Sequence, residues 1–472
     1  MSLLEIDGLQ CYIVSNATRF EARACIVDQG IVLVPINEEL SELSRKNWWC
    51  CRRRRRHDEA PLLQRTFDFD DLLGVSVNAE VGTLQLVHCP RQNIHGPRTR
   101  KDIILDFGGR DRLGQAQVQW AARVTTRCNS GERRFLVFVN PASGTGSAPQ
   151  AWQATEDLWK AVPGIQYTAV HTGTPGHAHE HVRSMDLGSC DGIVVISGDG
   201  LVHEVWNGLA ARPDAESALA LPVGHIPGGS GNGLAKSVLD NLGERYGIID
   251  AAFCIAKGGH QPIDLMHVQA GAECRCVSFL SLSAATIADV DIESERLRCI
   301  GSARFTVWAV WRILRPVRLC AELLYWPAEA PGQPAAEPPP LSAELEGQPP
   351  WKKIVDDFTI FWGCNTEWTS WDNRPAPGAR FCDGIWHLLL LRGAGASRSA
   401  LLRTLLGLNT GEHVHVPGVE VVRCRAFRLV PTSGSGHLVI DGETVPFGPL
   451  QIWPSRHHGS VLGGSSSNLS PV

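Results

Sequence analysis

Three short apolar runs in the middle of the chain show no alternation with polar residues. They are residues 135–139, 192–196 and 219–226, and the first two are rich in β-branched or aromatic side chains. Runs of this kind are typical of parallel strands that are buried on both faces of a sheet. Helix candidates fill the intervals between them. We therefore predict an α/β domain built from βαβ units over residues 133–258.

Each of the three runs leads into a turn that is rich in glycine and small polar residues. The turns are residues 140–147 (NPASGTGS), 197–200 (SGDG) and 227–232 (PGGSGN). Glycine at a strand end lets backbone amides approach a phosphate where any Cβ would intrude, and the first turn also suits a nest of N–H donors. One such turn is ordinary in an α/β domain. Three in succession favour a nucleotide site, with Asp199 as a base that deprotonates an acceptor.

The hydrophobic pattern changes on both sides of this domain. Residues 1–125 contain short β-like stretches, which predict a β-rich module, and residues 115–127 form either a closing helix or a closing strand. Residues 259–455 contain mostly strand-like runs, which predict an antiparallel β-sandwich. Inside it, residues 327–350 are rich in Pro, Ala and Glu, and we expect this insert and the tail 456–472 to be disordered.

Composition narrows the class of protein. The chain has 472 residues, of which 43% are hydrophobic and 20% charged, and this length predicts two or three domains. The net charge of −5 argues against nucleic acid as a general partner. Fifteen cysteines follow no regular spacing, and the acids Glu5 and Asp7 interrupt the start, so we expect reduced thiols, no signal peptide and a cytoplasmic location. No apolar run is long enough to span a bilayer.

Two further clusters leave alternatives open. Cys50 and Cys51 precede five consecutive arginines at residues 52–56, which form either a solvated loop or a contact with anionic lipid. Four histidines lie within residues 171–181. Their spacing matches no metal-ligand pattern, so a polar loop is favoured over a metal site.

Longer stretches of the chain are similar to a known family. They are residues 197–209 (SGDGLVHEVWNGL), residues 279–295 (FLSLSAATIADVDIESE) and residues 441–443 (DGE), preceded by Asn140-Pro141. In this order they resemble the catalytic domain shared by diacylglycerol, ceramide and sphingosine kinases, and they look most like sphingosine kinases. The resemblance covers residues 134–453. Residues 1–125 precede this core, and that position suggests a pleckstrin-homology-like fold for them.

The resemblance implies transfer of the γ-phosphoryl group of ATP to a lipid hydroxyl, with Mg²⁺ neutralising charge. It gives Asp199 the role of general base, as does its place between two glycines. The expected nucleotide contacts are Asn140, Thr172, Ser197, Gly198, Gly200, Gly229, Ser230, Glu295, Arg298, Arg304, Gly442 and Glu443. The arginines suit phosphate oxygens, and Glu443 is a candidate for assisting Mg²⁺. Ala142, Thr145 and Ser147 replace the basic residues usual in the family's first turn.

The choice of substrate depends on Asp291, which aligns with the acid that is expected to hold the amine of a long-chain base, with Ser281 in support. A carboxylate in an apolar pocket favours an ammonium head group over a neutral diacylglycerol. The alternative is a solvated acid within the acidic run 289–295. We therefore predict a sphingosine kinase. A ceramide or diacylglycerol kinase, and a lipid sensor or scaffold with little turnover, remain as alternatives.

Residues 305–315 have the pattern of an amphipathic helix that ends before Pro316. The expected membrane contacts on its apolar face are Val307, Val310 and Trp311. Three arginines gather at its end: Arg312, Arg315 and Arg318. This pattern suits a gate that rests on an anionic membrane, so that the protein would be peripheral at membranes. A helix that faces the core is the alternative.

Overall fold

A computed structural model describes residues 9–15, 18–35, 65–93, 96–107, 113–128, 131–144, 146–272, 274–300, 303–335, 337–432 and 435–463. The chain divides into two compact units: residues 1–133, 154–166 and 252–258 form the first, and the remaining residues form the second. The arginine-rich stretch after Cys50 and Cys51 lies outside the described residues. No helix in the described ranges is both long enough and apolar enough to cross a membrane.

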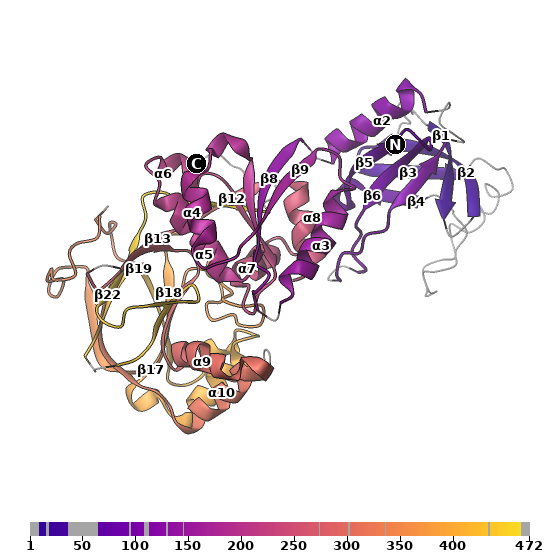
Figure 1. The fold of residues 1–472 in the computed structure, drawn as a ribbon. Helices are drawn as coiled ribbons and strands as arrows, with labels where there is room; N and C mark the ends of the chain where they lie inside the picture. The colour runs from indigo at the N-terminus through magenta and orange to yellow at the C-terminus, as the bar shows by residue number, and fades with distance from the viewer. Residues whose placement is uncertain are drawn as a thin grey trace. The chain divides into compact units, whose positions relative to one another are not determined.

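The first unit contains a seven-stranded antiparallel sheet in the order β4-β3-β2-β1-β7-β6-β5 (Figure 1, indigo and purple). The strands are β1 (Leu9–Ser15), β2 (Thr18–Val27), β3 (Gly30–Pro35), β4 (Arg65–Asp68), β5 (Leu72–Asn78), β6 (Thr83–His88) and β7 (Ile103–Asp106). Helix α2 (Gln115–Arg127) contacts β5 and buries Trp120 and Val124. The β-rich module is confirmed, and its closing element is a helix. The pleckstrin-homology-like assignment stays a prediction.

The α/β domain contains a six-stranded sheet in the order β12-β23-β11-β10-β8-β9. Its strands are β8 (Arg133–Val139), β9 (Ile165–His171), β10 (Gly192–Ser197), β11 (Val223–Pro227), β12 (His260–Ile263) and β23 (Gly459–Leu462). The helices between them are α3 (Ala148–Trp159), α4 (His177–Ser184), α5 (Asp199–Ala210), α6 (Ala215–Leu219), α7 (Gly233–Asn241) and α8 (Ile248–Lys257). Strands β8, β10 and β11 pair in parallel, as their uninterrupted apolar sequences predict.

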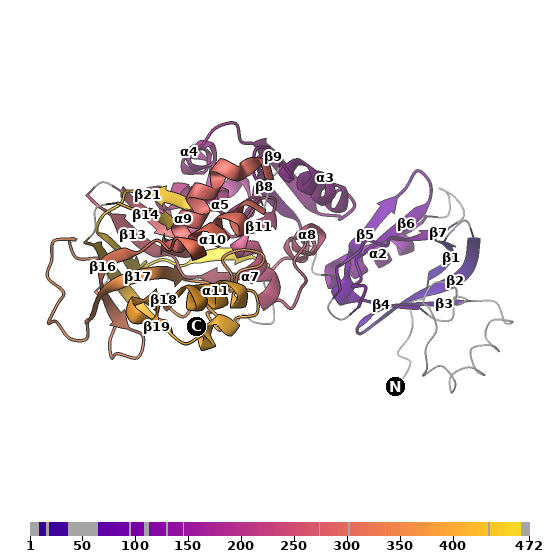
Figure 2. The same cartoon turned by 90° about the horizontal axis from the view of Figure 1, so that it is seen from below.

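The remaining strands form a ten-stranded sheet that is antiparallel throughout its pairings. They are β13 (Met266–Ala270), β14 (Cys274–Ser278), β15 (Ser281–Ala285), β16 (Leu319–Pro327), β17 (Lys352–Cys364), β18 (Trp386–Arg392), β19 (Val419–Pro431), β20 (Leu438–Ile440), β21 (Glu443–Val445) and β22 (Leu450–Pro454). Helices α9 (Thr286–Glu293), α10 (Ala303–Leu314) and α11 (Arg398–Gly407) accompany this sheet (Figure 2). Its core contains Phe358, Phe361, Trp386 and Phe427, none of which is exposed.

Two expected boundaries need correction. Strand β12 follows residue 258 but pairs with β23 in the α/β sheet, not with the sandwich. Strand β23 belongs to the tail that we expected to be disordered, and it also pairs in parallel with β11. The tail is therefore ordered through Gly463, and residues 464–472 lie outside the described part of the chain.

The expected disorder of residues 327–350 is also wrong. The guanidinium of Arg428 donates hydrogen bonds to the carbonyl oxygens of Ala343 (2.6 Å) and Pro340 (3.0 Å). The indole of Trp453 donates to the Ala335 carbonyl (2.6 Å). Side chains of β19 and β22 thus satisfy the carbonyls of the insert, which is held by polar contacts although its composition offers few apolar groups to bury.

Candidate active site

The three glycine-rich turns lie together because β8, β10 and β11 are parallel and end at the same edge of the sheet. The Gly198 amide donates to the Ser143 hydroxyl (3.1 Å). A Cβ added to Gly229 would lie 2.3 Å from the Gly198 Cα, and a Cβ added to Gly144 would lie 3.0 Å from the Gly229 carbonyl carbon. At these positions only glycine allows the backbones to approach so closely. The result is a compact set of backbone amides next to Ser197, at the end of β10.

Asp199 is the first residue of α5, and only 8% of it is exposed. Its carboxylate accepts hydrogen bonds from the amides of Gly233 (2.8 Å) and Leu234 (3.1 Å) at the start of α7. Burial raises the pKa of Asp199, whereas the nearby His225 and the two amides oppose this rise. Fixed donors therefore orient a carboxylate that binds a proton more readily than an exposed aspartate does.

Two residues that the sequence analysis did not assign support this arrangement. His225 lies in β11 with its Nδ1 3.7 Å from the Asp199 carboxylate, and its Nε2 is 2.9 Å from the Ser197 carbonyl oxygen. Burial lowers the pKa of His225, and because a carbonyl oxygen can only accept, Nε2 donates to it. The Asn232 side chain accepts a hydrogen bond from the Gly229 amide (2.9 Å) and donates one to the Gly229 carbonyl (2.8 Å), so it closes the third turn. The sequence signal that could have identified His225 is that it is a titratable residue within the otherwise apolar run 219–226.

Asp441 connects α5 to the ten-stranded sheet. Its buried carboxylate accepts hydrogen bonds from the Ser278 hydroxyl, the amides of Phe279, Leu280 and Ser281, and the His203 ring (2.7–3.1 Å). Burial lowers the pKa of His203, but the contact with Asp441 and the charges of Glu443 and Glu204 outweigh burial, so the pKa is raised. Ser281, a predicted substrate contact, therefore lies in the loop that Asp441 organises. The DGE motif at residues 441–443 was the sequence signal for Asp441, although the motif alone predicts no role for this aspartate.

Four other predicted residues form a charged group beside Asp199. Arg304 is buried and its guanidinium pairs with Glu295, which is half-exposed. The Glu443 carboxylate lies against Gly200, where an added Cβ would be 2.5 Å from its Oε1. Burial raises the pKa of Asp291 to about 6; Arg304 opposes this rise, and the charges of Glu295, Glu443 and Asp199 add to it. This environment argues against the alternative that Asp291 is a solvated acid.

The remaining predicted nucleotide contacts lie around the turns. Asn140 follows β8 and accepts the Ala142 amide on its side-chain oxygen (3.0 Å), and the buried Thr172 follows β9. Ser230 is exposed at the tip of the third turn, and Gly442 has a φ of +90° with no atom within 4 Å of an added Cβ. The side chain of Arg298 lies outside what the structure describes. Their contacts with a nucleotide stay predictions.

Comparison with known proteins identifies the family. Residues 134–268 match the model of the diacylglycerol kinase catalytic domain, and residues 360–459 match the YegS C-terminal NAD kinase beta sandwich-like domain. Sphingosine kinase 1 of Homo sapiens is 35% identical over 329 residues, which cover 66% of this chain and 85% of that protein. The chain belongs to the sphingosine kinase family. Sphingosine kinase 2 of Arabidopsis thaliana is 36% identical over 316 residues, and this chain covers only 65% of its length.

One of the solved structures with a similar fold is a bacterial protein. A crystal structure from Bacillus anthracis str. Sterne, assigned to the diacylglycerol kinases, superposes with a TM-score of 0.50. The superposition covers 70% of this chain and 97% of the other, at 18% sequence identity. At that identity the likeness concerns the fold alone, and it agrees with the predicted α/β domain followed by a β-sandwich.

Helix α10 presents an apolar face to solvent. Val307, Val310, Trp311 and Leu314 are 50%, 53%, 42% and 55% exposed. The alternative of a core-facing helix is therefore wrong for these side chains. The expected arginine cluster needs a correction: Arg312 is bound to Asp289 (2.5 and 2.8 Å), which also accepts the Trp308 indole N–H. Helix α10 is thus tied to its neighbour α9 by one side while the apolar side stays exposed.

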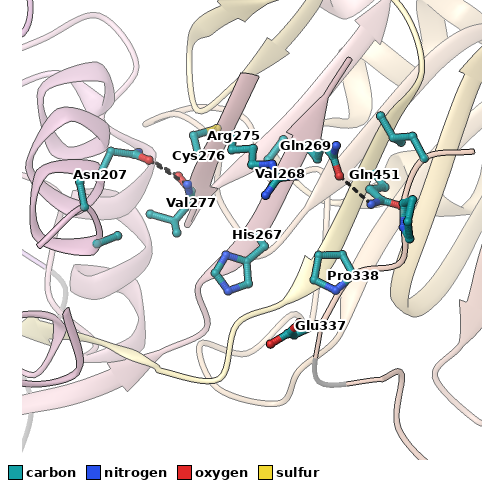
Figure 3. Close-up of a pocket in the computed structure, with 14 residues that line it drawn as sticks. Asn207, His267, Val268, Gln269, Arg275, Cys276, Val277, Glu337, Pro338 and Gln451 are labelled. Atoms are coloured by element: carbon teal, nitrogen blue, oxygen red, sulfur yellow. Dashed lines mark hydrogen bonds between the residues drawn. The ribbon is translucent and has the colours of Figure 1, made fainter. Parts of the chain in front are cut away.

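A separate cavity of about 550 Å³ lies at the C-terminal end of α5 (Figure 3). On one side the Asn207 amide group bonds to the Val277 backbone (2.8 and 3.0 Å), and on the other Gln451 donates to Gln269 (3.0 Å). Its lining includes none of the predicted site residues. Asp199 and the glycine turns begin the same helix, so the cavity and the candidate active site lie at opposite ends of α5.

Proposed function

We propose that the chain is a lipid kinase that transfers the γ-phosphoryl group of ATP to the primary hydroxyl of sphingosine or a related long-chain base, giving sphingosine 1-phosphate. The observation that carries this proposal is the position of Asp199, where the three glycine-rich turns meet. Its raised pKa favours acceptance of the hydroxyl proton. The names of the human and Arabidopsis relatives support the choice of substrate.

The turns would bind the triphosphate. The backbones of Gly198 and Gly229 lie against each other at this edge of the sheet, and α5 begins there with the positive end of its dipole. Mg²⁺ prefers carboxylate oxygens, and the exposed carboxylate of Glu443 beside Gly200 fits that preference. When bound, the ion would neutralise charge on the phosphates. Asp199 would accept the proton of the attacking hydroxyl.

Asp291 would select the lipid head group. Its carboxyl lies near those of Asp199 and Glu443, whose charges add to the rise in its pKa. An ionised carboxylate there would attract the ammonium group of a long-chain base and give no comparable attraction to a neutral lipid. Ser281 would support it from the loop that Asp441 holds.

The exposed apolar face of α10 would bring the enzyme to its substrate. Val307, Val310 and Trp311 would insert into the interfacial region of an anionic membrane, and Arg315, which lies over the Trp311 ring at 4.7 Å, would meet the lipid head groups. We thus propose a cytoplasmic protein that binds membranes peripherally.

A substrate panel tests the proposal. The purified chain is incubated with radiolabelled ATP, Mg²⁺ and mixed micelles that contain sphingosine, ceramide or diacylglycerol, and kcat/KM is measured for each lipid. We expect sphingosine to be preferred at least about tenfold over both neutral lipids. Preference for ceramide or diacylglycerol would replace the substrate assignment. Nucleotide binding without phosphorylation of any of the three would favour the sensor or scaffold instead.

A further inference from the structure

An aspartate, a cysteine and a histidine from distant parts of the second unit meet outside the site described above. Asp264 lies between β12 and β13, Cys382 lies in the loop before β18, and His458 lies between β22 and β23. One potential ligand atom from each residue lies within 4.8 Å of the others. The Asp264 Oδ1 is 3.1 Å from the His458 Nδ1, and the Cys382 Sγ is 3.7 Å from the same nitrogen.

These separations match those of ligands around a tetrahedral zinc ion. Zinc bonds of about 2.3 Å to sulfur, about 2.0–2.1 Å to nitrogen and about 2.0–2.2 Å to oxygen imply a sulfur–nitrogen separation of about 3.5 Å and a nitrogen–oxygen separation of about 3.4 Å. The observed distances differ from these values by about 0.3 Å or less. Small rotations of the exposed Cys382 and His458 side chains suffice to close that difference.

Hydrogen bonds hold the three segments together before any ion binds. Asp264 is only 4% exposed, its amide donates to the Phe381 carbonyl (2.6 Å), and its Oδ2 accepts the Gly384 amide (2.6 Å). The Ser455 amide donates to the Leu265 carbonyl (3.0 Å). The aspartate, the cysteine loop and the histidine loop are therefore aligned by the backbone, so that binding costs little reorganisation.

The local charges also suit a cation. The Asp264 carboxylate, the Cys382 thiol and the His458 imidazole lie together, and Asp383 adds a second carboxylate next to Cys382 in the chain. A divalent cation would stabilise both the thiolate and the carboxylate.

We propose that Asp264, Cys382 and His458 bind one Zn²⁺ ion, with water as the fourth ligand. A mixed thiolate, imidazole and carboxylate set favours zinc over Mg²⁺ or Ca²⁺, which take oxygen ligands. The chain passes from the six-stranded to the ten-stranded sheet between β12 and β13, and it returns between β22 and β23. The ion joins these two crossings, so its role is to fix the nucleotide-binding sheet to the lipid-binding sheet.

A metal titration tests this site independently of lipid kinase activity. The full-length chain, stripped with a chelator under reducing conditions, is titrated with Co²⁺ as a spectroscopic probe and with Zn²⁺ in competition. We expect one ion per chain, thiolate-to-cobalt absorption, and a rise in Tm of about 3 °C or more on adding Zn²⁺ in large excess over its Kd. Cys382→Ser and His458→Gln should each weaken binding at least about tenfold and remove the Tm shift.

The matched control is His457→Gln, which alters the neighbouring histidine in the same loop but outside the cluster. It should bind the ion as the unaltered chain does. Failure of the unaltered chain to bind one ion, or normal binding by both Cys382→Ser and His458→Gln, would overturn the proposal. Circular dichroism of each variant shows whether it is folded, and if one of the two is not, the other decides.

Discussion

Asp199 and Asp441 are both buried carboxylates, but their hydrogen bonds differ in number. Asp441 accepts five hydrogen bonds, one more than the roughly four lone-pair positions of a carboxylate, so no position is left for another donor. Asp199 accepts two, both from backbone amides at the start of α7. Asp199 therefore retains oxygen lone pairs for a substrate proton, whereas Asp441 is committed to holding the loop from Ser278 to Ser281.

The pKa of Asp291 predicts a pH dependence for substrate binding. When the pH falls below this pKa of about 6, the Asp291 carboxyl becomes neutral and no longer attracts an ammonium group. The KM for sphingosine should therefore rise about fourfold between pH 7.5 and pH 5.5. Asp291→Asn should raise this KM at pH 7.5 and make it independent of pH over the same range. The KM for ATP, measured in parallel, is the control, and a flat KM for sphingosine in the unaltered enzyme would exclude this role.

The contact between His203 and Asp441 predicts a pH dependence of stability. Because the pKa of His203 is raised on folding, its contribution is complete below the unfolded pKa of about 6.5 and is lost as the pH rises through the folded value. The difference in free energy of unfolding between the unaltered chain and His203→Gln should therefore shrink with rising pH. Urea unfolding at several pH values measures it. A difference that grows with pH would contradict the pairing.

At the scale of elements, the turns depend on glycine where their backbones touch. Gly229→Ala would place a Cβ 2.3 Å from the Gly198 Cα and force the second and third turns apart. We expect at least about tenfold weaker binding of ATP, because the second and third turns would no longer lie together beside the phosphates. Gly173→Ala is the control, since nothing lies within 4 Å of its added Cβ. Equal ATP affinity of the two variants, measured by calorimetry, would show that this convergence is unimportant.

Helix α10 has two sides with different roles. Arg312 and Trp308 fasten one side to Asp289 of α9, while Val310 and Trp311 stay exposed. Replacing both Val310 and Trp311 with Asp should reduce association with phosphatidylserine vesicles at least about tenfold and leave ATP binding unchanged. Val355→Asp on β17 alters a valine that is 61% exposed and serves as the control. Unchanged sedimentation of the double variant with vesicles would remove the membrane role.

At the scale of the whole molecule, the sequence predicted those features that depend on local patterns. Apolar runs located β8 and β10, and glycines located the turns that follow them. The roles that the family motifs give to Asp199 and Asp291 stay predictions. Long-range pairings were not predictable in this way. Strand β23 has four residues, and its parallel contact with β11 joins Val461 to Val223, which no local pattern indicates.

The composition of residues 327–350 led to a wrong prediction of disorder, because buried polar side chains from other strands hold this segment in place. Residues 327–350 offer few apolar groups, but Arg428 and Trp453 donate to their carbonyls from strands that are distant in sequence. The same limit applies to His225 on β11, because its neighbour Asp199 is the first residue of α5. In both cases the deciding contact exists only once the chain is folded.

The central claim is that Asp199 takes the proton from the lipid hydroxyl. Its most direct test is single-turnover phosphorylation of sphingosine by the unaltered chain, by Asp199→Asn and by the surface control Asp214→Asn. Asparagine keeps one acceptor oxygen for the amides of Gly233 and Leu234, so ATP affinity and Tm are measured alongside to confirm that the site is intact. We predict a rate that is lower by about 10²–10⁴-fold for Asp199→Asn and unchanged for Asp214→Asn. Equal rates for Asp199→Asn and the unaltered chain would contradict the account.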